Sequence, residues 1–172
     1  MSSSLVIYMK TKTDDIKKGN RICLLDMSTT PARELMNENV LPQSIDSLDD
    51  ERVYKKLTID QIRQVINYYT FKIEEMKKQI QECNDEITIL RENMLKTKSI
   101  EIYRAIEGDL ENTKTSILEC QSEIETYTEY QNLWSYSVLQ VYIATLQNNG
   151  QWDFLNDRPV DDNGYELWYY LI

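Results

Sequence analysis

The sequence predicts a mainly α protein, in which a long antiparallel coiled-coil helical hairpin is joined to a small α+β head formed by the N- and C-terminal segments. Two observations lead to this prediction. The middle of the chain carries two apolar series with alternating steps of three and four residues, and their phase breaks near residue 98. The two ends carry short apolar runs that are typical of strands. We therefore expect residues 1–57 and 147–172 to form the head and residues 58–146 to form the hairpin.

The N-terminal segment reads as two short strands followed by one or two short helices. The runs "SLVIYM" and "RICLLDM" are apolar and are separated by polar residues with Gly19 and Asn20 among them, which predicts two strands that pair antiparallel. Thr30 and Pro31 predict the start of a short helix, with Thr30 as its N-cap and proline in the first helical position.

A second short helix is expected between Leu48 and Leu57. Ser47 precedes this segment and Asp50 stands three residues further on, which is the pattern of a helix start. Pro42 separates the two expected helices because proline disrupts a helix interior.

The first long helix is expected to begin at Ile59. Thr58 and Gln61 have the spacing of a capping box, in which each side chain binds the other residue's backbone N–H. From there a seam of apolar residues repeats every 3.5 residues on average, which is the condition for a coiled coil. The expected core positions of this helix are Ile59, Ile62, Ile66, Tyr69, Ile73, Met76, Ile80, Cys83, Ile87, Leu90 and Met94.

A second long helix is expected after a turn near residues 96–100. Ser99 is its expected N-cap, with Glu101 in the first turn. The series continues to Val141, with polar Thr113 and Gln131 as its weak points. The expected core positions of this helix are Tyr103, Ile106, Leu110, Ile117, Cys120, Ile124, Tyr127, Trp134 and Val138.

The phase break between the two series favours a chain that folds back on itself. An antiparallel hairpin would place Tyr69 against Tyr127. The alternative is one continuous helix of about 88 residues, roughly 130 Å long at 1.5 Å per residue. No glycine or proline marks the turn, so this alternative stays open at the level of sequence.

The C-terminal segment is expected to return to the head. Gly150 is placed to end the second helix in a left-handed conformation, and Asn163 and Gly164 predict a turn before the run "YELWYYLI". This run reads as a strand that joins the N-terminal strands and either belongs to the core or docks on a neighbouring subunit. The candidate docking residues are Tyr68, Phe71, Leu133, Tyr136, Trp168, Tyr169 and Tyr170.

Composition argues against several classes of function. The chain has no histidine and a net charge of −10, so we expect no histidine-based catalysis, no metal or other cofactor, and no binding of nucleic acid. Its cysteines, Cys23, Cys83 and Cys120, form no CxxC motif, and we expect a cytoplasmic, reducing location or a virion assembled there. The longest apolar run near the start has five residues, so we expect no membrane insertion.

The sequence therefore favours a non-catalytic structural or adaptor subunit of a larger assembly. Its partners would be other protein subunits or further copies of itself, bound through the coiled coil and the aromatic C-terminal run, and a minor virion component is one form that such a subunit takes. No catalytic residue and no small-molecule substrate is indicated. The alternatives are a small enzyme that uses carboxylates or a cysteine without histidine, and a coiled-coil protein that tethers membranes.

Overall fold

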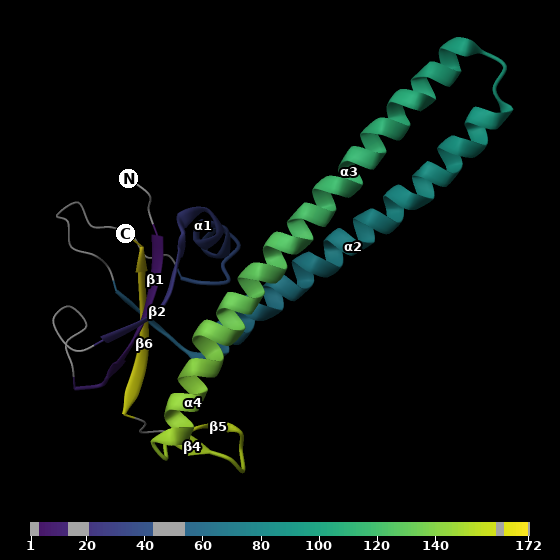
Figure 1. Ribbon diagram of the computed structural model, residues 1–172. Helices are drawn as coiled ribbons and strands as arrows, with labels where there is room; N and C mark the ends of the chain where they lie inside the picture. Colours follow the sequence, from purple (N-terminus) through teal and green to yellow (C-terminus); the bar gives the residue numbers. More distant parts are fainter. Residues whose placement is uncertain (1–3, 14–20, 43–53, 161–163, 172) are drawn as a thin grey trace. The chain divides into compact units, whose positions relative to one another are not determined.

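The computed structural model describes residues 4–13, 21–42, 54–160 and 164–171. The protein is mainly helical, with two long helices and a small antiparallel sheet (Figure 1). The chain divides into two units, which are described separately. Unit 1 consists of Met1–Tyr68 and Gln131–Ile172, and unit 2 consists of Tyr69–Tyr130.

Unit 1 contains a four-stranded antiparallel sheet built from both ends of the chain. Its strand order is β2-β1-β6-β3. The strands are β1 (Ser4–Thr11), β2 (Arg21–Ser28), β3 (Lys55–Leu57) and β6 (Tyr165–Leu171). The predicted antiparallel pairing of the two N-terminal strands is confirmed, and so is the prediction that the last strand joins them. β6 lies between β1 and β3 and not at an edge of the sheet.

Alternate residues of the sheet form two different faces. On one face, Leu5, Ile7 and Met9 of β1 are buried, and Ile7 lies opposite Tyr169 and Met9 opposite Leu167 of β6. Helix α1 (Thr29–Asn37) contacts β1 and β2, and the segment Leu133–Leu139 also contacts β2. The core of unit 1 therefore lies between this face and the helices.

The other face of the sheet is aromatic and charged. Tyr8 lies opposite Trp168 and Lys10 opposite Glu166 in the pairing of β1 with β6. The ring of Tyr8 stacks on Tyr170 at a centroid distance of 5.6 Å, and the guanidinium carbon of Arg21 lies 4.2 Å from the centroid of the Tyr8 ring.

Two expectations about the N-terminal segment were wrong. Helix α1 begins at Thr29 with Ser28 in the N-cap position, so Pro31 is the third helical residue and Thr30 is not the cap. Proline is tolerated there because the first N–H groups of a helix have no intrahelical acceptor. Residues 55–57, expected to be helical, form β3 because they pair with β6, a contact that no local pattern reveals. The remainder of the second expected helix, residues 48–53, lies outside the described residues, as does Ser47.

The two long helices are α2 (Ile59–Lys96) and α3 (Ile100–Asn132), separated by residues 97–99. The capping box at the start of α2 is confirmed: the Thr58 N–H donates to Gln61 Oε1 at 2.9 Å, and the Gln61 N–H donates to Thr58 Oγ1 at 3.1 Å. Ser99 caps α3 as predicted, because its Oγ accepts a hydrogen bond from the Ile102 N–H at 3.4 Å.

Within unit 2 the two helices pack together. Ile87 of α2 forms a buried cluster with Ile106 and Leu110 of α3. The predicted contact of Tyr69 with Tyr127 is confirmed, with ring centroids 6.0 Å apart. Residues early in α2 therefore contact residues late in α3, and the alternative of one continuous helix is wrong.

The chain re-enters unit 1 through a wide helical turn. Leu133–Leu139 form a π-helix, followed by α4 (Gln140–Asn148). Gly150 then adopts a φ of 68°, as predicted for the end of this helix. A hairpin of two short strands follows, β4 (Trp152–Asp153) and β5 (Arg158–Pro159), which the sequence analysis did not predict. Of the predicted turn before β6, Asn163 lies outside the described residues.

Candidate functional site

The predicted core positions differ widely in burial. The buried ones are Ile59, Ile62, Tyr69, Ile73, Met76, Ile87, Ile106, Leu110, Cys120, Trp134 and Val138. The half-buried ones are Ile66, Ile80, Cys83, Leu90, Met94, Ile117, Ile124 and Tyr127. Tyr103 is 40% exposed and Val141 is also exposed, so neither position contributes to a buried seam.

The π-helix explains why Val141 is not buried. A π-turn contains more residues than an α-turn and so rotates every following side chain relative to a regular helix. Beyond Trp134 and Val138, the buried residues are Tyr142 and Leu146, each four positions further on. Sequence periodicity assumed a regular helix here and extended the seam to Val141 instead of Tyr142, which is wrong.

The predicted docking residues also separate into groups. Phe71 and Tyr136 are exposed, whereas Tyr68, Leu133 and Trp168 are half-buried. Tyr169 and Tyr170 are 0% and 1% exposed, and the Tyr169 hydroxyl donates to the Pro42 carbonyl at 2.8 Å. In this structure these two tyrosines are core residues and present no ring to a partner.

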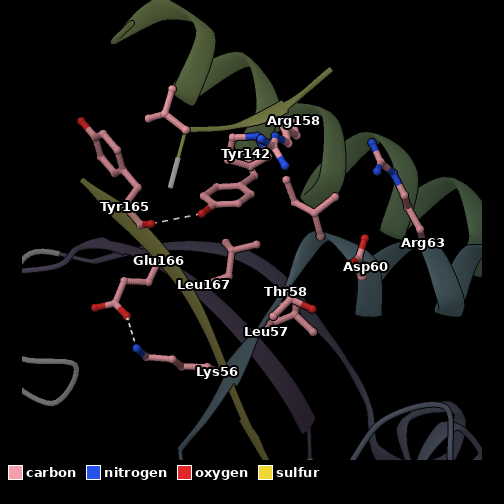
Figure 2. A pocket seen from close by; sticks show the side chains of 13 residues that line it. Lys56, Leu57, Thr58, Asp60, Arg63, Tyr142, Arg158, Tyr165, Glu166 and Leu167 are labelled. Carbon is pink, nitrogen blue, oxygen red and sulfur yellow. Dashed lines mark hydrogen bonds and ion pairs between the residues drawn. The ribbon is translucent and has the colours of Figure 1, made fainter. Parts of the chain in front are cut away.

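An open groove of about 430 Å³ lies in unit 1, beside the start of α2 (Figure 2). Residues far apart in the sequence form it, from β3 and the start of α2, from α4, from β5 and from β6. The residues that line the groove are Lys56, Leu57, Thr58, Ile59, Asp60, Arg63, Tyr142, Arg158, Pro159, Val160, Tyr165, Glu166 and Leu167. One wall is thus apolar, and charged side chains stand around it.

The positions of these side chains follow from their secondary structure. Figure 2 shows Asp60 and Arg63 projecting from the start of α2, while Arg158 comes from β5. Tyr142 of α4 is buried, and its hydroxyl donates to the Tyr165 carbonyl of β6 at 3.1 Å. Burial and the negative charge of Glu166 raise the pKa of Tyr142 to about 12, so this hydroxyl stays protonated near neutral pH. It therefore acts as a donor that ties α4 to β6.

Glu166 holds two lysines beside the groove. Its Oε1 lies 3.0 Å from Lys10 Nζ and its Oε2 lies 3.0 Å from Lys56 Nζ. Burial acts to raise the pKa of Glu166, but the hydrogen bonds from Lys56 and Lys10 outweigh it and hold the pKa below its usual value. Both lysine ammonium groups also lie within 6 Å of the Trp168 ring, at 5.9 Å and 5.5 Å from its centroid. The carboxylate is thus ionised and fully engaged.

The sequence analysis predicted none of these residues as a ligand site. Ile59 was expected only in the coiled-coil core, and Lys56 was expected in a helix. The groove forms when β3 pairs with β6 and Tyr142 is turned inward, and both events depend on long-range contacts or on the wide turn. No spacing motif in the sequence carries this information.

Among the described residues, no group of three or more acidic or cysteine side chains is arranged to hold a metal ion. No helix in the described ranges combines the length and the apolar character needed to span a membrane.

Comparison with protein-family models, with curated proteins and with solved structures found no match.

Proposed function

We propose that this chain is a non-catalytic structural or adaptor subunit, and that α2 and α3 form an antiparallel coiled-coil hairpin that binds another protein. The observation that carries the proposal is the exposure of large apolar side chains on the two-helix unit. These residues are Phe71, Ile89, Leu95, Ile100, Ile102, Tyr103 and Leu118. Where such side chains cluster, exposed apolar surface is typical of an interaction site.

The spacing of the seam supports a coiled coil. Apolar residues recur at steps of three and four along both helices, and opposed pairs such as Tyr69 and Tyr127 are in contact. Two helices alone leave part of the seam open, since Ile80, Cys83 and Ile124 are only half-buried. A further helix from a partner would bury these side chains.

The exposed residues concentrate where α2 passes into α3. Leu95, Ile100 and Ile102 are 88%, 65% and 54% exposed and flank the connection at residues 97–99. Lys96 and Lys98 stand among them, together with Glu101. This end of the hairpin therefore suits a partner with an apolar groove and acidic groups opposite the two lysines.

The test replaces the apolar side chains at the connection without touching the seam. The variant Leu95→Ser, Ile100→Ser, Ile102→Ser should keep its helical circular dichroism and lose binding, because these side chains make few contacts within the chain. Binding is measured as light-scattering mass of the purified chain over a concentration series and as the recovery of neighbouring proteins from the native source.

A matched control is available in unit 1. Phe154 and Leu155 are also largely exposed, at the tip of the β4–β5 hairpin, so Phe154→Ser, Leu155→Ser removes similar apolar surface elsewhere. The control should bind normally. Equal losses in both variants, or none in either, would contradict a role for the helical connection.

A further inference from the structure

The groove in unit 1 gathers positive charge in a chain that is strongly acidic. The chain has 19 lysines and arginines against 29 aspartates and glutamates, yet Lys56, Arg63 and Arg158 all line this one groove. They come from β3, α2 and β5, so no single charged segment of sequence accounts for their meeting. Convergence of like charges on one cavity is unfavourable unless a counter-charge occupies it.

The two arginines are at most weakly neutralised by their neighbours. Arg63 makes no ion pair with any residue in the described part of the chain. Arg158 forms a weak ion pair with Asp153, in which Nε lies 3.9 Å from Oδ2, beyond hydrogen-bond distance, and the arginine side chain is 62% exposed. That carboxylate is already engaged within its own turn, where it accepts hydrogen bonds from the N–H groups of Leu155 and Asn156 and from Asn156 Nδ2.

The acidic groups at the groove do not cancel this charge. Glu166 is held by both Lys10 and Lys56, at 3.0 Å each, so its charge is already offset. Among the described residues, Asp60 is the other carboxylate that lines the groove, which the two arginines also line. The positive charge left over belongs to guanidinium groups, which bind tetrahedral oxyanions through two parallel hydrogen bonds.

Backbone donors add to the same surface. Ile59 and Asp60 are the first two residues of α2 and both line the groove. The capping box uses the N–H groups of Thr58 and Gln61, and the Ile62 N–H donates to the Thr58 carbonyl. The N–H groups of Ile59 and Asp60 precede the first intrahelical acceptors, so a helix of this length offers them to an anion together with its dipole.

The size of the groove and its apolar wall define the rest of the ligand. Its volume of about 430 Å³ exceeds what a bare oxyanion fills and falls in the range typical of small organic ligands. Leu57, Ile59 and Leu167 are buried residues of its wall. We infer that the groove binds a phosphate ester, with the phosphoryl group between Arg63 and Arg158 at the start of α2 and the organic group against this wall.

Titration of the full chain with phenyl phosphate tests the inference, with amide NMR as the readout and ionic strength held constant by chloride. Saturable shifts at the Ile59 and Asp60 amides are expected. Arg63→Gln and Arg158→Gln should each weaken binding by about tenfold or more, since each removes a charge-assisted hydrogen-bonding group. Asp60→Asn should tighten binding because it removes a carboxylate that would repel the phosphoryl group. Inorganic phosphate should bind more weakly than the ester because it leaves the apolar wall empty.

Controls separate a built site from general charge attraction. Arg104→Gln makes the same charge change at an exposed position of unit 2 and should leave the affinity unchanged. Equal weakening by Arg104→Gln, absence of saturation, or equal affinity for benzoate would overturn the inference. This titration measures ligand binding at residues of unit 1 only. Its outcome is therefore independent of the partner binding proposed for the connection between α2 and α3.

Discussion

Lys10 and Glu166 form an ion pair across β1 and β6, with Lys10 Nζ 3.0 Å from Glu166 Oε1. The lysine side chain is 5% exposed and the glutamate side chain 14% exposed, so both charges are largely withdrawn from water. Lys10 Nζ also donates to the Thr11 carbonyl at 3.0 Å. The pair joins the first and last strands of the chain, and its removal should therefore act on the whole sheet.

Glu166→Gln should destabilise unit 1 by about 3 kcal/mol, because it leaves the buried Lys10 ammonium without its counter-charge. The measurement is the free energy of unfolding in urea at neutral pH. Lys56→Gln is the matched control. This variant removes the second lysine bound to the same carboxylate. Because the Lys56 side chain is 64% exposed, its loss should lower the free energy of unfolding by only about 0 to 1 kcal/mol. Similar decreases in the free energy of unfolding for both variants would contradict the claim that the buried Lys10 ammonium causes the larger effect.

The stability difference between the native chain and Glu166→Gln should depend on pH. The pKa of Glu166 is lower in the folded chain than its ordinary value of 4.5, because the hydrogen bonds from Lys56 and Lys10 outweigh the effect of burial. Its stabilisation is therefore complete above that ordinary value and is lost as the pH falls through the folded pKa. Urea midpoints of both proteins should converge on acidification below about pH 4.5 and should keep their separation between about pH 5 and 7. Convergence that begins near neutral pH would show that another group is responsible.

Tyr142 and Tyr169 should ionise late in an alkaline titration. Burial raises the pKa of each to about 12, and Glu166 adds to the effect at Tyr142. Because the unfolded pKa is about 10, folding stability should be retained below that pH and fall as the pH rises above it. Tyrosinate absorbance should show that Tyr142→Phe and Tyr169→Phe each remove one late-titrating group. If either variant instead removes a tyrosine that ionises near the ordinary pKa, the replaced hydroxyl is exposed to solvent and the prediction is wrong.

The capping box at the start of α2 should contribute about 1 kcal/mol to stability. Thr58→Ala and Gln61→Ala should each destabilise the chain, and the double variant should cost less than the sum of the two because the side chains act reciprocally. Thr126→Ala is the control, since Thr126 is exposed within α3 and alanine is the better helix former. Strict additivity in the urea unfolding energies would show that the two hydrogen bonds act independently.

Deletion of Tyr136 should be tolerated, although it lies within a helix. The π-helix Leu133–Leu139 carries the extra residue of a wide turn, and Tyr136 is exposed. Its loss would leave Trp134, Val138, Tyr142 and Leu146 at steps of three, four and four, which a regular α-helix can bury on one face. Deletion of the exposed Glu125 from the regular part of α3 should instead rotate the following residues by about 100° and unfold unit 1. Thermal unfolding of the two deletion variants decides between these outcomes, and equal loss of structure would argue against the wide turn.

Features governed by neighbouring residues could be predicted from the sequence. Thr58 and Gln61 lie three residues apart, and this spacing alone located the start of α2 at Ile59. The phase break near residue 98 similarly located the connection between α2 and α3, because the turn follows from the loss of local periodicity. The apolar run at the C-terminus indicated a strand for the same reason.

Features set by long-range contacts or by an unusual turn could not be predicted. Lys55 and Leu57 form a strand because β6 lies beside them, and their own sequence favoured a helix. Tyr142 points inward because the preceding turn is wide, whereas regular periodicity selected Val141. The groove depends on both the pairing of β3 with β6 and the inward position of Tyr142. Its charged residues could therefore not be predicted as a site, because only the fold brings β3, α2 and β5 together.

The central place of β6 in the sheet has a consequence for biosynthesis. β1 is synthesised more than 150 positions before its neighbour β6. At a translation rate of about 5 to 20 residues per second, β1 waits on the order of ten seconds or more on the ribosome with one side unpaired. The contacts between α2 and α3 join residues closer in the sequence and can form during that interval, so the sheet is expected to be completed after them.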